Sequence, residues 1–425
     1  MKRWTTCLFL ALAAGTCAFE KIALVDGFDY APEMDTETTD GMRKVLERVL
    51  ETGADTILWR THSGSVPRYA SEAMDLSVVE TPLDKRRVPL TLPVRGWVRY
   101  QRCAPDALRT VFGLCADLPQ VKCAGAHMLQ EDAHGGRYWS LDSWTLDHPQ
   151  YWCRSADGKM EMHHASFAYP EVIAHRRAIV REILARGAQM IYLDTTRNGG
   201  YGPRDDYVKP NLEEWARRHP GEAAPADFHD PRWLEVVARG HYAYYRAIRE
   251  EIRATGRDVP FVITIGNVRI QNGPDWNYAG CGFDWRKVVD DGLVDGLAVV
   301  SICADEKDPF GSTERIFRHV MQYVNGRCKV YFPIRAYNFS KNQPSYEQLA
   351  KWAGISPPEA IRRLLDIAVR CGASGIVMEC VDPGNYPSAD CEVIRNFNPP
   401  SVSVTSRTRK RAYGARRMSP PTKSK

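Results

Sequence analysis

The chain alternates between short apolar runs and longer stretches in which apolar positions recur at helical spacing, with polar loops between them. Strands that are apolar throughout, and separated by helices, are typical of a parallel sheet that is covered on both faces. The pattern therefore predicts an α/β fold. The apolar runs occupy residues 21–25, 54–59, 121–129, 190–193, 260–265, 294–302, 329–334 and 375–378.

The number of these runs, eight, indicates a closed (β/α)8 TIM barrel rather than an open sheet. An open doubly wound sheet would usually carry the glycine-rich GxGxxG turn after an early strand, and that motif is absent from the sequence. No change in composition divides residues 19–400. We therefore expect a single barrel domain over this range.

The intervening stretches carry helix start and stop signals. Pro170 and Glu171 open a stretch whose apolar residues recur every three or four positions, and Gly187 follows it. Residues 39–52, 233–254 and 359–370 have the same character, with Gly53, Gly256 and Gly372 after them. Proline in the first turn and glycine after the last one are typical of helix ends.

The N-terminal residues have the pattern of a secretory signal peptide. Lys2 and Arg3 precede the apolar run 7–14, and the small residues Thr16 and Ala18 precede a cut before Phe19. The run is too short to span a bilayer as a permanent helix, and no later stretch is long enough. We expect residues 1–18 to be removed and the protein to be secreted or periplasmic.

The formal net charge of +5 comes from the C-terminus. Residues 401–425 hold eight Lys or Arg and no acid, so the charge without them is −3, or −5 if Lys2 and Arg3 are also removed. The pattern predicts a disordered basic tail over residues 401–425 and a mildly acidic body. Such a body is not a nucleic-acid-binding surface.

Several common kinds of site are absent from the sequence. The ten cysteines after residue 18 form no CxxC pair, and His163 and His164 are adjacent rather than at metal-ligand spacing. No GxSxG elbow is present. We therefore expect no metal ion and no cofactor.

The strands of a barrel end at one rim, where the loops that follow them build the active site. At least five of the eight runs here end in an acid, and the others in Arg, Asn or His. We expect the substrate to be bound by Asp26, Arg60, His62, Trp139, Arg197, Asn267, Glu306 and Arg335. Trp139 belongs to a set of loop aromatics, with Trp144, Tyr151, Trp152, Trp276 and Trp285, whose flat faces suit sugars.

Two carboxylates on either side of one anomeric carbon would make a glycosidase. Asp194 is the candidate for the ionised member, because Arg197 nearby would lower its pKa. Glu379 is the candidate acid, because it follows an apolar run whose dry wall would raise its pKa. Glu131 and Glu306 are further candidates for the second carboxylate.

Four segments resemble the bacterial family-10-like glycosyl hydrolases, a group of glycosyl-hydrolase-like barrels of largely uncharacterised type. Residues 168–198 resemble the group's "PEVR…EI…DGIYLD..R" segment, and residues 51–71 its second strand and loop. Residues 148–159 resemble its "HPEW…DG" loop, and residues 283–300 its approach to strand six. The segments occur in the group's order and span most of residues 20–385.

This resemblance implies a TIM barrel that acts on a poly- or oligosaccharide at its strand ends. Carried over position by position, Arg60, Asp194 and Arg197 match residues that the group places in its pocket. Thr195 and Thr196 depart from the pattern, because many relatives have larger residues there.

Three functions remain open at this stage. The first is an exported glycoside hydrolase, the second is a non-catalytic glycan-binding barrel, and the third is a barrel lyase or isomerase that acts on a small molecule. The sequence predicts a carbohydrate partner in the first two cases, and it sets no oligomeric state.

Overall fold

The computed structural model of the 425-residue chain describes most of the region between residues 18 and 399. The described residues are 18–26, 30, 38–63, 66–74, 106–130, 143–196, 206–266, 268, 270, 282–302, 304–338, 343–379, 381 and 384–399. The expected signal peptide, up to residue 17, and the expected tail, residues 401–425, lie outside them.

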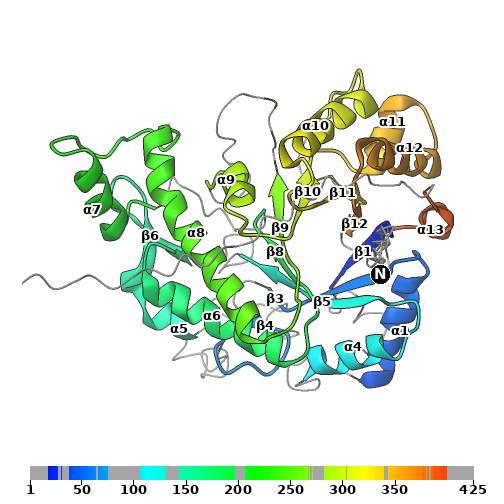
Figure 1. Ribbon diagram of the computed structural model, residues 1–425, viewed down its shortest axis with the longest axis horizontal. Helices are drawn as coiled ribbons and strands as arrows, with labels where there is room; N and C mark the ends of the chain where they lie inside the picture. Colours follow the sequence, from blue (N-terminus) through cyan, green and yellow to red (C-terminus); the bar gives the residue numbers. More distant parts are fainter. Residues whose placement is uncertain are drawn as a thin grey trace, which may run out of the picture.

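A closed barrel of eight parallel strands forms the centre of the molecule (Figure 1). Its strands follow one another around the barrel in the order β1-β12-β11-β10-β9-β8-β5-β2, so chain order is kept all the way round. Each of the eight apolar runs in the sequence overlaps one of these strands to within a residue or two at each end, and the predicted TIM barrel is confirmed. The strands are β1 (Glu20–Val25), β2 (Thr56–Arg60), β5 (Cys123–Leu129), β8 (Ile191–Asp194), β9 (Phe261–Gly266), β10 (Gly296–Ser301), β11 (Lys329–Arg335) and β12 (Gly375–Glu379).

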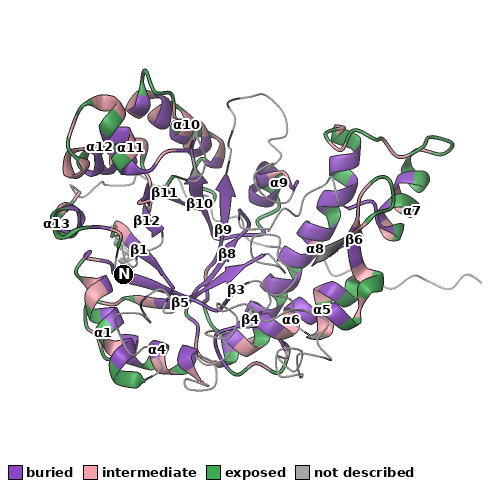
Figure 2. Ribbon diagram, turned by 180° about the vertical axis from the view of Figure 1, so that it is seen from behind, coloured by how far each residue is buried: buried purple, intermediate pink, exposed green. Residues whose placement is uncertain are grey.

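Helices surround the barrel and bury its outer face (Figures 1 and 2). In α12 (Pro357–Cys371) the Ser356 side chain accepts a hydrogen bond from the Glu359 amide, and the helix ends at Gly372, whose φ of +79° suits glycine. The other helices are α1 (Thr39–Leu50), α4 (Ala107–Ala116), α5 (Ser143–Asp147), η4 (Pro149–Tyr151), α6 (Pro170–Ala185), α7 (Lys209–Arg218), α8 (Pro231–Ala254), α9 (Trp285–Asp290), α10 (Pro309–Val324), α11 (Tyr346–Ala353) and α13 (Ser388–Asn396). No helix within the described ranges is apolar over enough residues to cross a membrane.

The two faces of each strand supply two separate cores. On β1, Ala23 and Val25 belong to the large core between barrel and helices, whereas Ile22 and Leu24 belong to a smaller core inside the barrel. This alternation with a period of two residues is a property of every strand. The barrel interior is filled by Ile22, Leu24, Leu58, Met190, Tyr192, Val262, Ala298, Val300, Tyr331 and Val377.

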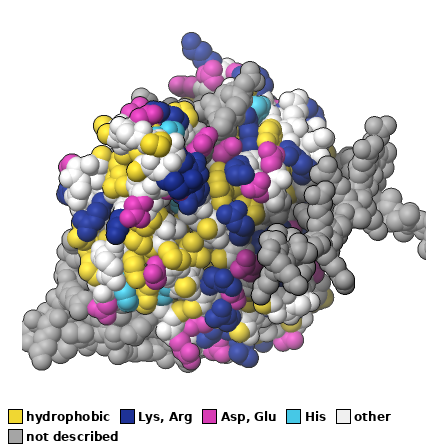
Figure 3. All heavy atoms as spheres, turned by 60° about the vertical axis from the view of Figure 1, so that its left-hand side comes forward, with side chains coloured by type: hydrophobic (Ala, Val, Ile, Leu, Met, Phe, Trp, Pro, Cys, Tyr) yellow, Lys and Arg dark blue, Asp and Glu magenta, His cyan; other side chains and the backbone are white. Residues whose placement is uncertain are grey.

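A lobe beside the barrel is built from the loop regions after β5 and β8. It contains the antiparallel pair β6 (Trp152–Arg154) and β7 (Met160–Ala165), the helix α7 and the N-terminal part of α8. Its own small core is Tyr207, Trp215, Trp233, Val236 and Val237. Viewed with this lobe turned forward, basic and acidic side chains are interspersed with hydrophobic ones (Figure 3).

A second antiparallel pair follows β2 directly. It consists of β3 (His62–Ser63) and β4 (Val66–Pro67), and it leads into residues 68–74. The side chain of Glu182 on α6 fixes this segment by accepting hydrogen bonds from Tyr69, from Ser71 and from two backbone amides. The segment is therefore anchored next to the end of β2.

Candidate active site

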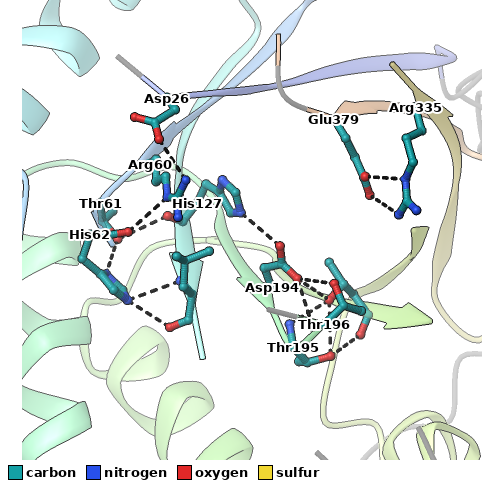
Figure 4. A network of polar contacts seen from close by, with 12 residues as sticks. Asp26, Arg60, Thr61, His62, His127, Asp194, Thr195, Thr196, Arg335 and Glu379 are labelled. Carbon is teal, nitrogen blue, oxygen red and sulfur yellow. Dashed lines mark hydrogen bonds and ion pairs between the residues drawn. The ribbon is translucent and has the colours of Figure 1, made fainter. Parts of the chain in front are cut away.

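Polar side chains replace the apolar ones at the C-terminal end of the barrel interior. Two residues beyond Leu24 is Asp26, two beyond Leu58 is Arg60, and two beyond Tyr192 is Asp194. The period of a strand places such residues on the same, inward face. Each is less than a tenth exposed. We call this set the polar ring: Asp26, Arg60, His127, Asp194, Thr264, Arg335 and Glu379 (Figure 4).

Asp194 ends β8 and is held by donors on its own loop and on β9. Its Oδ1 accepts hydrogen bonds from the Thr196 amide at 3.0 Å, the Thr196 hydroxyl at 2.7 Å and the Thr264 hydroxyl at 3.1 Å. Thr195 ties the two strand ends together, because its amide and hydroxyl bond Thr264 Oγ1 and Thr264 O, each at 2.7 Å. Donors aimed at a carboxylate favour its ionised form.

The other oxygen of Asp194 faces His127 on the neighbouring strand β5. Asp194 Oδ2 lies 3.6 Å from His127 Nε2, which is longer than a hydrogen bond. The two strands are in register so that Leu129 pairs with Asp194, and the Gln130 amide donates to Asp194 O at 3.1 Å. Asp194 is therefore fixed at Oδ1 and directed at an imidazole through Oδ2.

Glu379 and Arg335 form a buried ion pair on the adjacent strands β12 and β11, where they are register partners. Arg335 Nε donates to Glu379 Oε2 at 2.8 Å, and Arg335 also bonds the carbonyl of Val300 on β10. Burial opposes the charge of Arg335, but Glu379, Tyr337 and Asp194 together outweigh it, and the pKa of Arg335 lies above its ordinary value. Glu379 thus faces a guanidinium, whereas the sequence led us to expect a dry apolar wall.

The end of β12 is held in place by Tyr386. The Tyr386 hydroxyl reaches Ile334 O at 2.6 Å and Glu379 O at 3.1 Å, and so it joins the ends of β11 and β12. Tyr386 has φ of +56°, a left-handed conformation that few non-glycine residues adopt. Tyr386 therefore fixes the backbone of Glu379 through its carbonyl oxygen.

Asp26 lies between two arginines. Arg60 NH1 donates to Asp26 Oδ2 at 2.9 Å, and Arg68 donates to Asp26 Oδ1. Arg68 comes from the anchored segment after β4, and all three side chains are buried. The sequence prediction included Asp26 and Arg60 but not Arg68, because Arg68 reaches the ring from a segment that the sequence shows only as a loop.

His62 follows Arg60 by two residues but does not enter the polar ring. It is completely buried, with Nδ1 2.7 Å from the Thr61 hydroxyl and Nε2 2.9 Å from Leu129 O. Burial lowers the pKa of His62 to about 3, despite the opposing effect of the Leu129 carbonyl. The structure therefore gives this neutral imidazole a supporting position between β2 and β5.

The other predicted site residues lie away from the ring or outside the described part of the chain. Glu306 is exposed in the turn before α10. Glu131, Trp139, Arg197 and Asn267 belong to segments that the structure does not describe. Their roles remain predictions.

The loop aromatics that are described pack within the protein. Trp144 stacks on His175 at 4.1 Å and on His148 at 4.5 Å. Trp152 is buried and donates to Thr145 O at 2.7 Å, and Trp285 on α9 is 1% exposed. Trp152 and Trp285 are therefore buried in the protein and not open to a sugar, whereas Trp144 is half-buried and its role remains a prediction.

Besides Arg68, sequence reasoning missed His127 and Thr264 of the polar ring, because both lie inside apolar runs. Counting back by two from the end of β5 and of β9 would have placed both on the inward face, and the same count from Asp194 gives Tyr192. No group of three or more potential metal ligands occurs within the described ranges.

Comparison with known proteins supports the fold. No protein-family model matches the chain, and no curated protein does either. Among solved structures, the PgaB (BpsB) glycoside hydrolase domain from Bordetella bronchiseptica is similar, with a TM-score of 0.55 and 14% identity over 89% of this chain and 98% of that one.

Two beta-galactosidases are also similar. The enzyme from the psychrophilic Marinomonas ef1 has a TM-score of 0.54 and 9% identity over 88% of this chain. A GH42 beta-galactosidase from G. stearothermophilus has a TM-score of 0.54 and 10% identity over 89%. This chain spans 58% and 55% of their lengths. At these identities the similarity establishes a barrel fold of the kind found in glycoside hydrolases.

Proposed function

We propose that this protein is a glycoside hydrolase that cleaves a poly- or oligosaccharide at the polar ring. The observation that carries the proposal is the placement of Asp194 and Glu379 on the inward face of the barrel, at the rim where enzymes of this fold have their active sites. Asp194 and Glu379 follow the interior residues Tyr192 and Val377 by two positions, and both are buried at the same end of the barrel interior.

Asp194 acts as the ionised carboxylate in this proposal. Three donors on Oδ1 keep it charged and fix its orientation, which a nucleophile or a water-activating base requires. The charge that develops on the sugar in the transition state is positive, so a fixed carboxylate next to it lowers the barrier. His127 and Thr264 hold Asp194 on either side.

The second carboxylate must carry a proton to the leaving oxygen. Glu379 was the first candidate from the sequence, but Arg335 beside it favours the charged form. We therefore assign the proton donor to Glu131, which follows Gln130 directly, and we assign Glu379 and Arg335 to binding sugar hydroxyls. Charge-assisted hydrogen bonds from such a pair suit the polar edge of a sugar.

The test is hydrolysis of a panel of polysaccharides by the purified protein and by the variant Asp194→Asn. We expect turnover of at least one polysaccharide and a loss of about 10²- to 10⁴-fold in kcat with the variant, at unchanged thermal stability. Full activity of Asp194→Asn on a good substrate would contradict the assignment.

A second comparison separates the two candidate acids. A substrate with an activated aryl leaving group needs little protonation, so a variant that lacks the acid keeps much of its activity on it. We expect Glu131→Gln to recover on such a substrate, whereas Glu379→Gln does not. Recovery of Glu379→Gln alone would return the acid role to Glu379.

A non-catalytic glycan-binding barrel is the second candidate function. It is favoured by the surroundings of Asp194 and Glu379, because hydrogen-bond donors next to one and a guanidinium next to the other favour the charged form of both. The same panel distinguishes the two functions, since a binding protein would retain oligosaccharides without cleaving any of them.

We also propose that the protein works outside the cytoplasm, because residues 1–18 have the signal-peptide pattern. N-terminal sequencing of the protein recovered from the culture medium or periplasm tests this, and the expected first residue is Phe19.

A further inference from the structure

Tyr192 is a polar residue in an otherwise apolar part of the barrel interior. It lies on β8 two residues before Asp194, so its side chain points to the same inward face. The side chain is completely buried. Its hydroxyl has no hydrogen-bond partner among the described residues.

A buried hydroxyl without a partner lowers the stability of a folded chain, and phenylalanine would fill the same space without that penalty. Such a group calls for an oxygen ligand that the described part of the chain does not supply. The interior residues around Tyr192 offer none, because apart from Tyr331 they are aliphatic.

The position of Tyr192 places it next to the polar ring. Its register partner on β5 is His127, and Asp194 follows it by two residues on the same face of β8. Burial raises the pKa of Tyr192 well above its ordinary value, and the charges of Asp194 and Glu379 raise it further, so the hydroxyl keeps its proton. The ring of His127 packs edge-on against Tyr192, with centroids 5.6 Å apart, and this contact holds the tyrosine in place.

We propose that the Tyr192 hydroxyl forms the floor of the substrate site and hydrogen bonds an oxygen ligand held between Asp194 and Glu379. In the free protein this ligand is a water molecule, which a sugar hydroxyl displaces on binding. The sugar contact rests on the proposed glycoside hydrolase function, whereas the water does not.

Tyr331 provides a matched control. It is the other tyrosine of the barrel interior and is equally buried, but it lies toward the opposite end. Its hydroxyl donates to Glu20 Oε2 at 2.9 Å. Removing the two hydroxyls one at a time therefore compares Tyr192, which has no hydrogen-bond partner in the described part of the chain, with Tyr331, which has one.

Thermal unfolding of Tyr192→Phe and Tyr331→Phe is the first measurement. We expect Tyr331→Phe to lower the melting temperature by a few degrees, because a bonded group is lost. Tyr192→Phe should lower it less, because the lost partner is a water molecule that can still bond the neighbouring carboxylates. A loss with Tyr192→Phe as large as that with Tyr331→Phe would show a direct protein partner and overturn the proposal.

Crystal structures of the wild type and of Tyr192→Phe at high resolution are the second measurement, and they need no substrate. We expect a water molecule within hydrogen-bond distance of Tyr192 Oη in the wild type, and its loss or displacement in the variant. A wild-type structure in which Tyr192 Oη bonds only to protein atoms would overturn the proposal.

Kinetics on whichever polysaccharide the panel identifies are the third measurement. We expect Tyr192→Phe to lower kcat/KM by about tenfold or more, with Tyr331→Phe within about twofold of the wild type. Unchanged kcat/KM in Tyr192→Phe would overturn the sugar contact. If no polysaccharide is cleaved, the hydrolase proposal fails, and the crystal structures still decide whether Tyr192 binds the water.

Discussion

The two ends of the barrel interior have similar side chains in different arrangements. Each has an inward tyrosine with an acid and a cation nearby. At the N-terminal end, Glu20 accepts from both Tyr331 and Lys329, so the three groups satisfy one another. At the C-terminal end, Asp194 and Glu379 each accept hydrogen bonds from donors of their own. The Tyr192 hydroxyl has no hydrogen-bond partner among the described residues.

A groove of about 1040 Å³ lies away from the polar ring, at the N-terminal end, where Glu20, Lys21 and Lys329 contribute to its lining. These three side chains have protein partners, because Lys329 pairs with Glu20 and Lys21 Nζ donates to Ile394 O at 2.8 Å. At the opposite end the Tyr192 hydroxyl has no partner among the described residues, and we regard it as the better guide to a substrate site.

Breaking the ion pair of the polar ring should have the largest effect. Arg335→Met leaves the Glu379 carboxylate buried next to an uncharged side chain, and we expect a loss of about 3–5 kcal/mol in the free energy of unfolding. Urea unfolding followed by circular dichroism measures this loss.

The double variant Arg335→Met with Glu379→Leu is the control. An apolar pair of similar size can replace a buried ion pair at little cost, so most of the lost stability should return. Equal stabilities of the single and double variants would show that the uncompensated charge is not the cause.

Much of the fold and part of the polar ring could be predicted from the sequence. The eight apolar runs each coincide with most of a barrel strand, because a strand buried on both faces needs apolar residues at nearly every position. Asp26, Arg60, Asp194, Arg335 and Glu379 were predicted at the strand ends, and the structure places all five on the inward face.

What could not be predicted depends on contacts between distant segments. Arg68 reaches Asp26 only because Glu182 on α6 anchors the segment after β4. His62 has the right spacing from Arg60 to face inward, but β2 ends at Arg60 and the imidazole turns to the Leu129 carbonyl instead. Neither outcome is encoded in local sequence.

His62 should make stability depend on pH, with an effect of intermediate size. Its pKa of about 3 in the folded chain lies below the ordinary value of 6.5. Between these two pH values the imidazole binds a proton in the unfolded chain but not in the folded one. Stability is full above pH 6.5 and falls as the pH decreases toward 3, by at most about 1.4 kcal/mol per pH unit. The charges of Arg176, Arg60 and His127 act on the His62 imidazole and lower its pKa further.

Urea unfolding at pH 6.5 and pH 5 measures this dependence, and we expect the wild type to lose about 2 kcal/mol through His62. His62→Gln keeps a donor for the Leu129 carbonyl and does not titrate, so its stability should change less between the two pH values. The same pH dependence in both proteins would assign the effect to other groups.

The smallest effect should come from the N-terminal end. Lys329→Met removes the ion pair with Glu20, but the side chains of Lys329 and Glu20 are 44% and 20% exposed, so water already screens the attraction. We expect a change of less than about 1 kcal/mol in the free energy of unfolding, and a further decrease of this effect in high salt. Tyr331 keeps its acceptor in this variant, because Glu20 remains. A loss as large as that of Arg335→Met would mean that the two ends of the interior are equally dependent on their ion pairs, and the contrast between a self-satisfied end and a ligand-binding end would not hold.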